Sequence, residues 1–185
     1  MDYLLNICIL LVIFSVSSLS KQFWDFELIK VGYFTSNASI ADIELNAKRI
    51  DRGRYGCSGF IEAKVDIYDE DVRVELIVKR SAFRSGPYTT LPMKIDNETL
   101  PTVFNVFYKN VVMENAQKCC ENAPYFEGNY VGPLTKRRVV LNECTIDTEK
   151  LPSYMMEGYY ITRTTVYAKD WYGYLETLVY VESAK

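Results

Sequence analysis

No histidine occurs among the 185 residues of the chain. Histidine is the side chain most often used as a general base, and the Ser-His-Asp and Cys-His arrangements of nucleophilic catalysis depend on it. Its absence excludes those enzyme classes and removes the commonest ligand of a zinc site. No two cysteines have the C-x-x-C spacing of a zinc site either. The sequence therefore predicts neither a metal ion nor a cofactor.

The GxSxG, P-loop and GxGxxG motifs are missing as well. A hydrolase with two carboxylates is the enzyme class that stays open, because the chain has 24 acidic residues. The tightest acidic cluster, residues 69–71, falls in a predicted hairpin turn, where solvated carboxylates are the simpler interpretation. We therefore expect a protein that is not an enzyme.

The chain also lacks an apolar run of the ~20 residues that a membrane-spanning helix needs. Its main apolar run extends from Leu4 to Val16 and is followed by Ser18 and Ser20, the small-x-small pattern that signal peptidase accepts. We predict a signal peptide over residues 1–20 and a secreted domain over residues 21–185; a membrane anchor is the alternative. Cleavage would leave no integral membrane segment.

The composition indicates a folded, β-rich domain. The formal net charge is only −3, with both signs mixed, so nothing favours nucleic acid or an anionic membrane as a partner. A hydrophobic fraction of 49% excludes disorder. The 15 tyrosines and 9 phenylalanines suit the pleated, half-buried surface of a sheet. One domain of ordinary size has room for a real core.

Apolar and polar residues alternate along several segments, as they do in half-buried strands. The first such segment is Ala41 to Lys48. The next two have inward-facing stripes on either side of residues 69–71, so they predict an antiparallel hairpin. These stripes are Ile61, Ala63, Val65 and Ile67, and Val72, Val74, Leu76 and Val78.

Two more hairpins and one helix complete the expected fold. Gly158–Ala168 and Tyr172–Glu182 are long β-rich runs on either side of a short turn, and Tyr125–Leu141 is predicted to form another hairpin. Pro101–Met113 has the i, i+3, i+4, i+7 spacing of an amphipathic helix, with a proline near its start. We predict a mostly β, immunoglobulin-like antiparallel sandwich with one short helical segment.

Four cysteines remain after the predicted cleavage, an even number that favours two disulfides in a secreted chain. Adjacent Cys119 and Cys120 would form a strained ring, so one of them should pair with Cys57 and the other with Cys144. A zinc site held by these cysteines is the rival interpretation. The sequons at Asn37 and Asn97 predict glycosylation on surface loops.

The apolar stripes have two interpretations. If the sheets splay apart, the stripes become the walls of an apolar pocket that one face of the predicted helix would cover. If the sheets pack closely, the same residues are only a core. The candidate cavity residues are Ile61, Ala63, Val65, Ile67, Val72, Val74, Leu76, Val78, Phe104, Phe107, Tyr108 and Val111.

A family resemblance bears on this choice. Three features carry it: Phe104 to Tyr108 before Cys119-Cys120, then Cys144 followed by Leu151-Pro152, then Glu157 to Tyr160 before a final hairpin. In these the chain resembles the insect CheA/CheB chemosensory proteins, which are distantly similar to the GM2-activator and MD-2-related lipid-recognition proteins. Nothing after Cys144 can form the disulfide that the GM2-activator family has near its final strand.

The resemblance implies a secreted β-sandwich that holds a lipid or another hydrophobic small molecule and acts in contact chemosensation or pheromone detection. It also implies a chemosensory receptor as a partner. The alternative function is a secreted protein-interaction module with a packed core and no ligand. The tyrosines between Tyr159 and Tyr180 favour that alternative, because tyrosine is enriched at protein interfaces.

Overall fold

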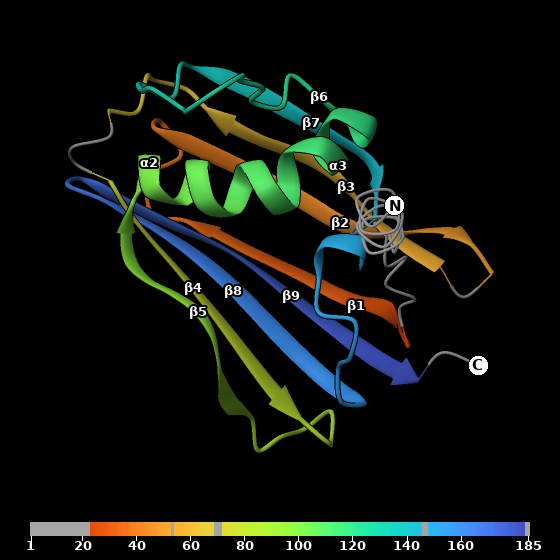
Figure 1. Ribbon diagram of the computed structural model, residues 1–185. Coiled ribbons are helices and arrows are strands. Elements are labelled where there is room, and N and C mark those ends of the chain that lie inside the picture. The colour runs from red at the N-terminus through yellow and green to blue at the C-terminus, as the bar shows by residue number, and fades with distance from the viewer. Residues whose placement is uncertain (1–22, 53, 69–71, 146–147, 184–185) are drawn as a thin grey trace, which may run out of the picture.

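The computed structural model describes residues 23–52, 54–68, 72–145 and 148–183. They form two antiparallel sheets, one continuous helical segment and the short 3-10 helix η3 (Thr148–Lys150) (Figure 1), which confirms a mostly β sandwich-like fold. The predicted signal peptide lies outside the described residues, as does the acidic turn 69–71. None of the described helices has the length and apolar character required to span a membrane.

The larger sheet has the strand order β1-β9-β8-β4-β5. Its strands are β1 (Trp24–Thr35), β4 (Arg73–Ser81), β5 (Thr89–Thr99), β8 (Gly158–Ala168) and β9 (Trp171–Ser183). The smaller sheet has the order β2-β3-β7-β6. Its strands are β2 (Ala41–Asp51), β3 (Arg54–Ala63), β6 (Cys120–Glu121) and β7 (Arg137–Cys144).

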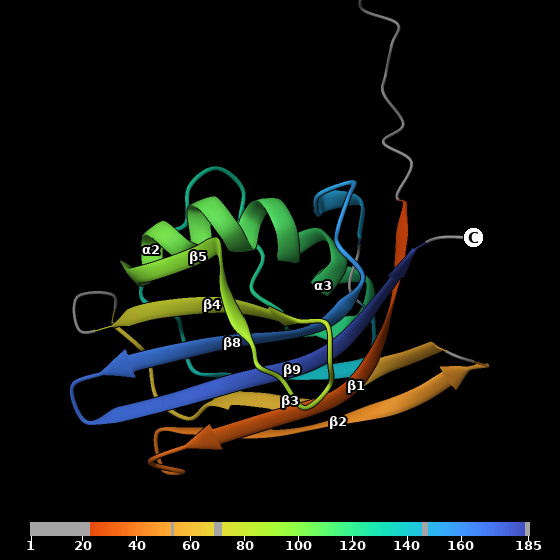
Figure 2. The same ribbon diagram turned by 90° about the horizontal axis from the view of Figure 1, so that it is seen from below.

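The edge strands β1 and β2 contact each other, so the two sheets approach on that side. The helical segment lies on the opposite side of the sandwich (Figure 2). It consists of α2 (Leu100–Val103), the π-helix η2 (Phe104–Val112) and α3 (Met113–Cys119). α2 contacts β4 and β5 of one sheet, whereas α3 contacts β6 and β7 of the other. The helical segment therefore bridges the open side of the sandwich.

The beginning of the helical segment follows from its sequence. The Thr99 side chain accepts a hydrogen bond from the backbone N–H of Thr102 at 3.3 Å, as an N-cap residue does. Pro101 occupies the first turn, where the missing N–H costs nothing. The predicted helix is thus confirmed, but it extends to Cys119 and its centre is π-helical.

Two clusters of buried residues form the larger part of the core. The first has seven buried members: Trp24, Leu28, Leu76, Val78, Tyr160, Val179 and Val181. The second has four: Val72, Val74, Leu100 and Val103. The stripe predicted on residues 72–78 supplies two residues to each cluster, so its inward orientation is confirmed.

Two of the predicted hairpins are wrong. The stripe at residues 61–67 begins in β3 of the smaller sheet, while β4 belongs to the larger one, so the two segments do not pair. Alternation shows which face of a strand is buried, but it does not show which strand lies beside it; Ile67 packs against the cluster that contains Val72 and Val74 without any pairing of the two strands. In the second case, β7 pairs with β3 and β6, and Tyr125 to Lys136 forms a loop whose only bridge is between Leu134 and Ile67. The β8–β9 hairpin is confirmed.

Candidate functional site

The π-helix η2 is the unusual element beside the space between the sheets. Six of its nine residues are apolar or aromatic, yet none of the nine is fully buried. A helix in this position normally buries one apolar face. π-Helices are rare, and they occur frequently at functional sites. The open side of the sandwich is therefore covered by apolar side chains that are only partly shielded from solvent.

Phe107 of η2 and Ile95 of β5 mark the centre of this region. Each is half-buried, and each packs against both core clusters. The two residues come from elements on the same side of the sandwich, since α2, which leads into η2, contacts β5. They therefore form an apolar junction between the two halves of the interior.

Further half-buried apolar residues surround the first core cluster. They come from both sheets and from the segment that precedes β8. They are Phe26, Val31, Tyr55, Cys57, Leu91, Leu151 and Met155. The sequence stripes did not include them, although the alternation of Leu91, Met93 and Ile95 could have pointed to β5; of these three, Met93 is 43% exposed and lies outside the lining. Together with Phe107 and Ile95 they form an apolar lining between the sheets.

The predicted cavity residues do not all belong to this lining. Ala63 is buried and Ile61 is half-buried on β3, and Ile67 packs against the second core cluster. Val65 follows the end of β3 and is 43% exposed, so it does not belong to the wall. Val111 is half-buried.

Phe104 and Tyr108 of η2 belong to an aromatic cluster with the loop 122–136. Phe104 packs on the Tyr130 ring, with centroids 4.6 Å apart, and Tyr108 lies near Phe126. The Tyr108 hydroxyl donates a hydrogen bond to the Pro124 carbonyl at 2.7 Å. Burial raises the pKa of Tyr108 to about 12, and Cys120 adds to the shift. This cluster fixes η2 to the loop, so these two side chains serve as anchors for the helix.

Arg80 is a charged residue on the same inner face. It follows Val74, Leu76 and Val78 in the alternation of β4, and its Cα partner is Tyr160, a member of the first core cluster. Its Nη2 donates to the Glu157 carbonyl at 2.5 Å. Its Nε atom is buried and has no hydrogen-bond partner.

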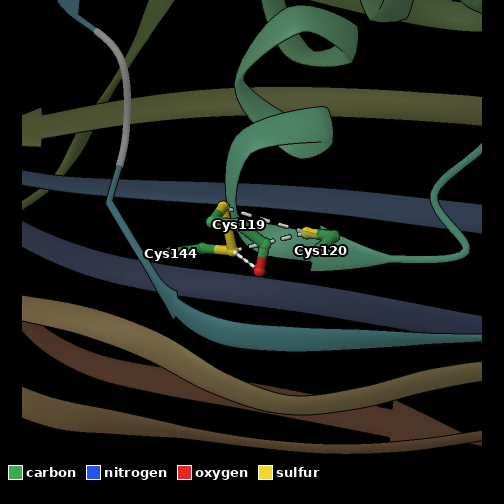
Figure 3. A group of neighbouring side chains, drawn as sticks. All are labelled: Cys119, Cys120 and Cys144. Atoms are coloured by element: carbon green, nitrogen blue, oxygen red, sulfur yellow. Dashed lines mark hydrogen bonds between the residues drawn. A yellow bond between two sulfur atoms is a disulfide. The ribbon is translucent and has the colours of Figure 1, made fainter.

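Three of the cysteines lie together where α3 meets β6 and β7 (Figure 3). Cys119 and Cys144 form a disulfide, which is one of the pairings that the sequence left open. The Cys120 sulfur lies 3.3 Å from the Cys144 sulfur and 3.9 Å from that of Cys119. The bridge joins the end of α3 to the end of β7.

The expected second disulfide is wrong, because Cys57 and Cys120 are free thiols. Cys57 is on β3 and Cys120 is on β6, and β7 lies between these strands. Two strand spacings place their Cα atoms at least roughly 9–10 Å apart, whereas a disulfide spans at most about 7 Å. Burial raises the pKa of Cys57 to about 11 and also raises that of Cys120. Both thiols are therefore protonated at neutral pH.

Two surface depressions lie away from the lining between the sheets. One, of about 430 Å³, is lined by Phe60, Val140 and Arg138 among others, and these side chains alternate with the inward-facing ones of β3 and β7. The Arg138 guanidinium lies 3.6 Å from the centre of the Phe60 ring and forms an ion pair with Glu62. The other, of about 170 Å³, lies under the loop 122–136 and includes Tyr130.

No family model and no curated protein matches this chain.

Proposed function

We propose that this protein is a secreted, non-enzymatic binding protein that holds a lipid or another hydrophobic small molecule between its two sheets, beside η2. The observation that carries the proposal is that η2 crosses the open side of the sandwich with six apolar residues and none fully buried. Each 100 Å² of apolar surface that a ligand removed from water would contribute about 2.5 kcal/mol. A bound apolar molecule would therefore stabilise an arrangement that is otherwise partly exposed.

Sequence features support the proposal that the protein acts outside the cell. The predicted signal peptide and the sequons indicate export, and the family resemblance suggests a role in contact chemosensation. Asn37 lies in the turn between β1 and β2, where its side chain accepts hydrogen bonds from the backbone and the hydroxyl of Ser39. Asn97 is exposed on β5. Glycans at both positions would project from the surface, and we place the ligand's receptor outside the cell.

The test is uptake of a fluorescent fatty-acid probe by the purified protein, together with mass spectrometry of solvent extracts. We expect a co-purifying lipid and saturable probe binding. Ile95→Trp adds bulk at the junction of the two core clusters and should weaken probe binding at least ten-fold. The matched control is Val106→Trp on η2, because Val106 is 65% exposed, and this variant should bind like the wild type. Absence of both lipid and probe binding in the wild type would refute the proposal.

The outer face of the larger sheet supports a second candidate function, a protein-interaction module. Phe34 of β1 packs against Tyr172 and Tyr174 of β9, with ring centroids 5.3 and 5.8 Å apart. Phe34 is 39% exposed and Tyr172 is 46% exposed. Aromatic side chains gathered in this way are typical of interface centres. Tyr174→Ala should abolish binding to a chemosensory receptor ectodomain, while Tyr154→Ala, on an exposed loop, should not; equal binding by both would dismiss this candidate.

A further inference from the structure

Resting on the proposed function, we infer that the ligand is a long-chain carboxylic acid and that the Arg80 guanidinium binds its carboxylate. Arg80 belongs to the inner face of β4, two residues beyond Val78 of the first core cluster. A cation at the end of an apolar stripe matches a molecule with an apolar tail and an anionic head group.

The position of Arg80 follows from the register of the sheet. Its Cα partner on β8 is Tyr160, which is 3% exposed. A Cβ atom added at Gly158, whose partner on β9 is the fully buried Val181, would lie 3.5 Å from Arg80 Nε. The guanidinium therefore lies among residues that face the interior of the sandwich.

Arg80 has no carboxylate partner among the residues that the structure describes. Glu157 contacts Arg80, but it offers only its backbone carbonyl, and its carboxylate accepts a hydrogen bond from the Tyr180 hydroxyl at 2.8 Å. By contrast, Arg163 on the outer face forms an ion pair with Glu176 at 2.6 Å. A partly buried cation without a counter-ion is unfavourable. The unpartnered Nε–H is thus a donor that a bound carboxylate could use.

The chemistry of Arg80 suits the head group of a fatty acid. A guanidinium offers a planar pair of N–H donors that matches a carboxylate, which makes arginine better suited to this head group than lysine. From Arg80 to Val74 the strand extends about 20 Å, and Leu76 and Val78 lie between them on the same face. The tail would lie along this stripe toward Phe107 and Ile95, which pack against both core clusters.

The experiment compares hexadecanoic acid with hexadecanol, which have tails of equal length, in competition for the same fluorescent probe. We expect the wild type to prefer the acid on the order of ten- to a hundred-fold, the value of a hydrogen bond to a charged group. Arg80→Gln should abolish that preference and leave binding of the alcohol unchanged. Lys79→Gln removes one positive charge from the neighbouring outward-facing residue and should keep the preference.

Each outcome has a distinct meaning. If the wild type binds acid and alcohol equally, or if Arg80→Gln keeps the preference, the inference is overturned while the apolar site stands. If neither compound binds, the proposed function fails. If Arg80→Gln does not fold, Arg80→Lys serves instead: it keeps the charge but loses the planar donor pair, so the preference should fall several-fold. An unchanged preference in that variant would overturn the role of Arg80.

Discussion

Removing the Cys119–Cys144 disulfide should destabilise the protein by about 3.5 kcal/mol. The bridge joins residues 25 apart in sequence. For a loop of this length, the chain-entropy relation gives about 12 cal/mol/K of lost unfolded-state entropy, hence about 3.5 kcal/mol at 25 °C. For a domain of this size that corresponds to a fall in Tm of roughly 7–14 °C. Cys144→Ser should show this loss in thermal and urea unfolding without reductant.

The position of Cys120 makes the prediction more specific. Its sulfur is 3.3 Å from that of Cys144, so it can take the place of Cys119 in the bridge after a small movement. Cys119→Ser should therefore lower the stability less than Cys144→Ser does. The double variant Cys119→Ser/Cys120→Ser should lower it as much as Cys144→Ser does. Cys57→Ala is the control and should change the Tm by no more than a few degrees. The reasoning is refuted if Cys144→Ser melts with the wild type, or if peptide mapping finds Cys57 in a disulfide.

Three other measurements test the fold and the site. Phe107→Ala should lower the free energy of unfolding in urea by about 2–3 kcal/mol, since Phe107 contacts both core clusters. Val106→Ala, at an exposed position, should lower it by under about 0.5 kcal/mol; equal losses in the two variants would contradict this. Gly59→Ala should lower the Tm strongly, because Gly59 has a φ of 135° and a Cβ atom would lie 2.0 Å from the Glu44 carbonyl oxygen; a wild-type Tm would disprove that contact. The pKa of Cys57, raised to about 11, means that the unfolded chain loses this proton more readily, so stability should fall between pH 9 and about 11. Cys57→Ala should lessen that fall; an identical pH profile would show that Cys57 is not its source.

The sequence predicted faces of strands better than it predicted their partners. Val72, Val74, Leu76 and Val78 are buried as their alternation indicates. The same alternation at residues 61–67 carries no information on whether the next strand pairs beside it or faces it across the sandwich. Pairing is fixed by contacts between distant segments, such as Ala63 with Arg137, and these cannot be read from a local period.

The cysteines illustrate the same limit. Composition and spacing predicted a bridge from the 119–120 pair to Cys144, which the structure has. They could not exclude a bridge to Cys57, because that required knowing that β7 lies between β3 and β6. Arg80 was overlooked for another reason: in the alternating run of β4 a single arginine resembles an ordinary strand-end residue. Its significance depends on Tyr160 and Glu157, which are about 80 residues away in sequence.

The two ends of the helical segment are fixed to the sheets, whereas its centre is anchored to the loop 122–136. At the start, Leu100 and Val103 are buried in the second core cluster and Thr99 caps the first turn. At the end, the disulfide of Cys119 joins α3 to β7. Between these anchors, η2 buries no residue fully. Local opening has its lowest cost where few apolar contacts must be broken. A ligand would therefore enter by displacement of η2 together with the loop 122–136, to which Phe104 and Tyr108 anchor it, while α2 and α3 stay in place. Reduction of the disulfide should then loosen one anchor and speed ligand exchange without altering the preference for an acid that Arg80 provides.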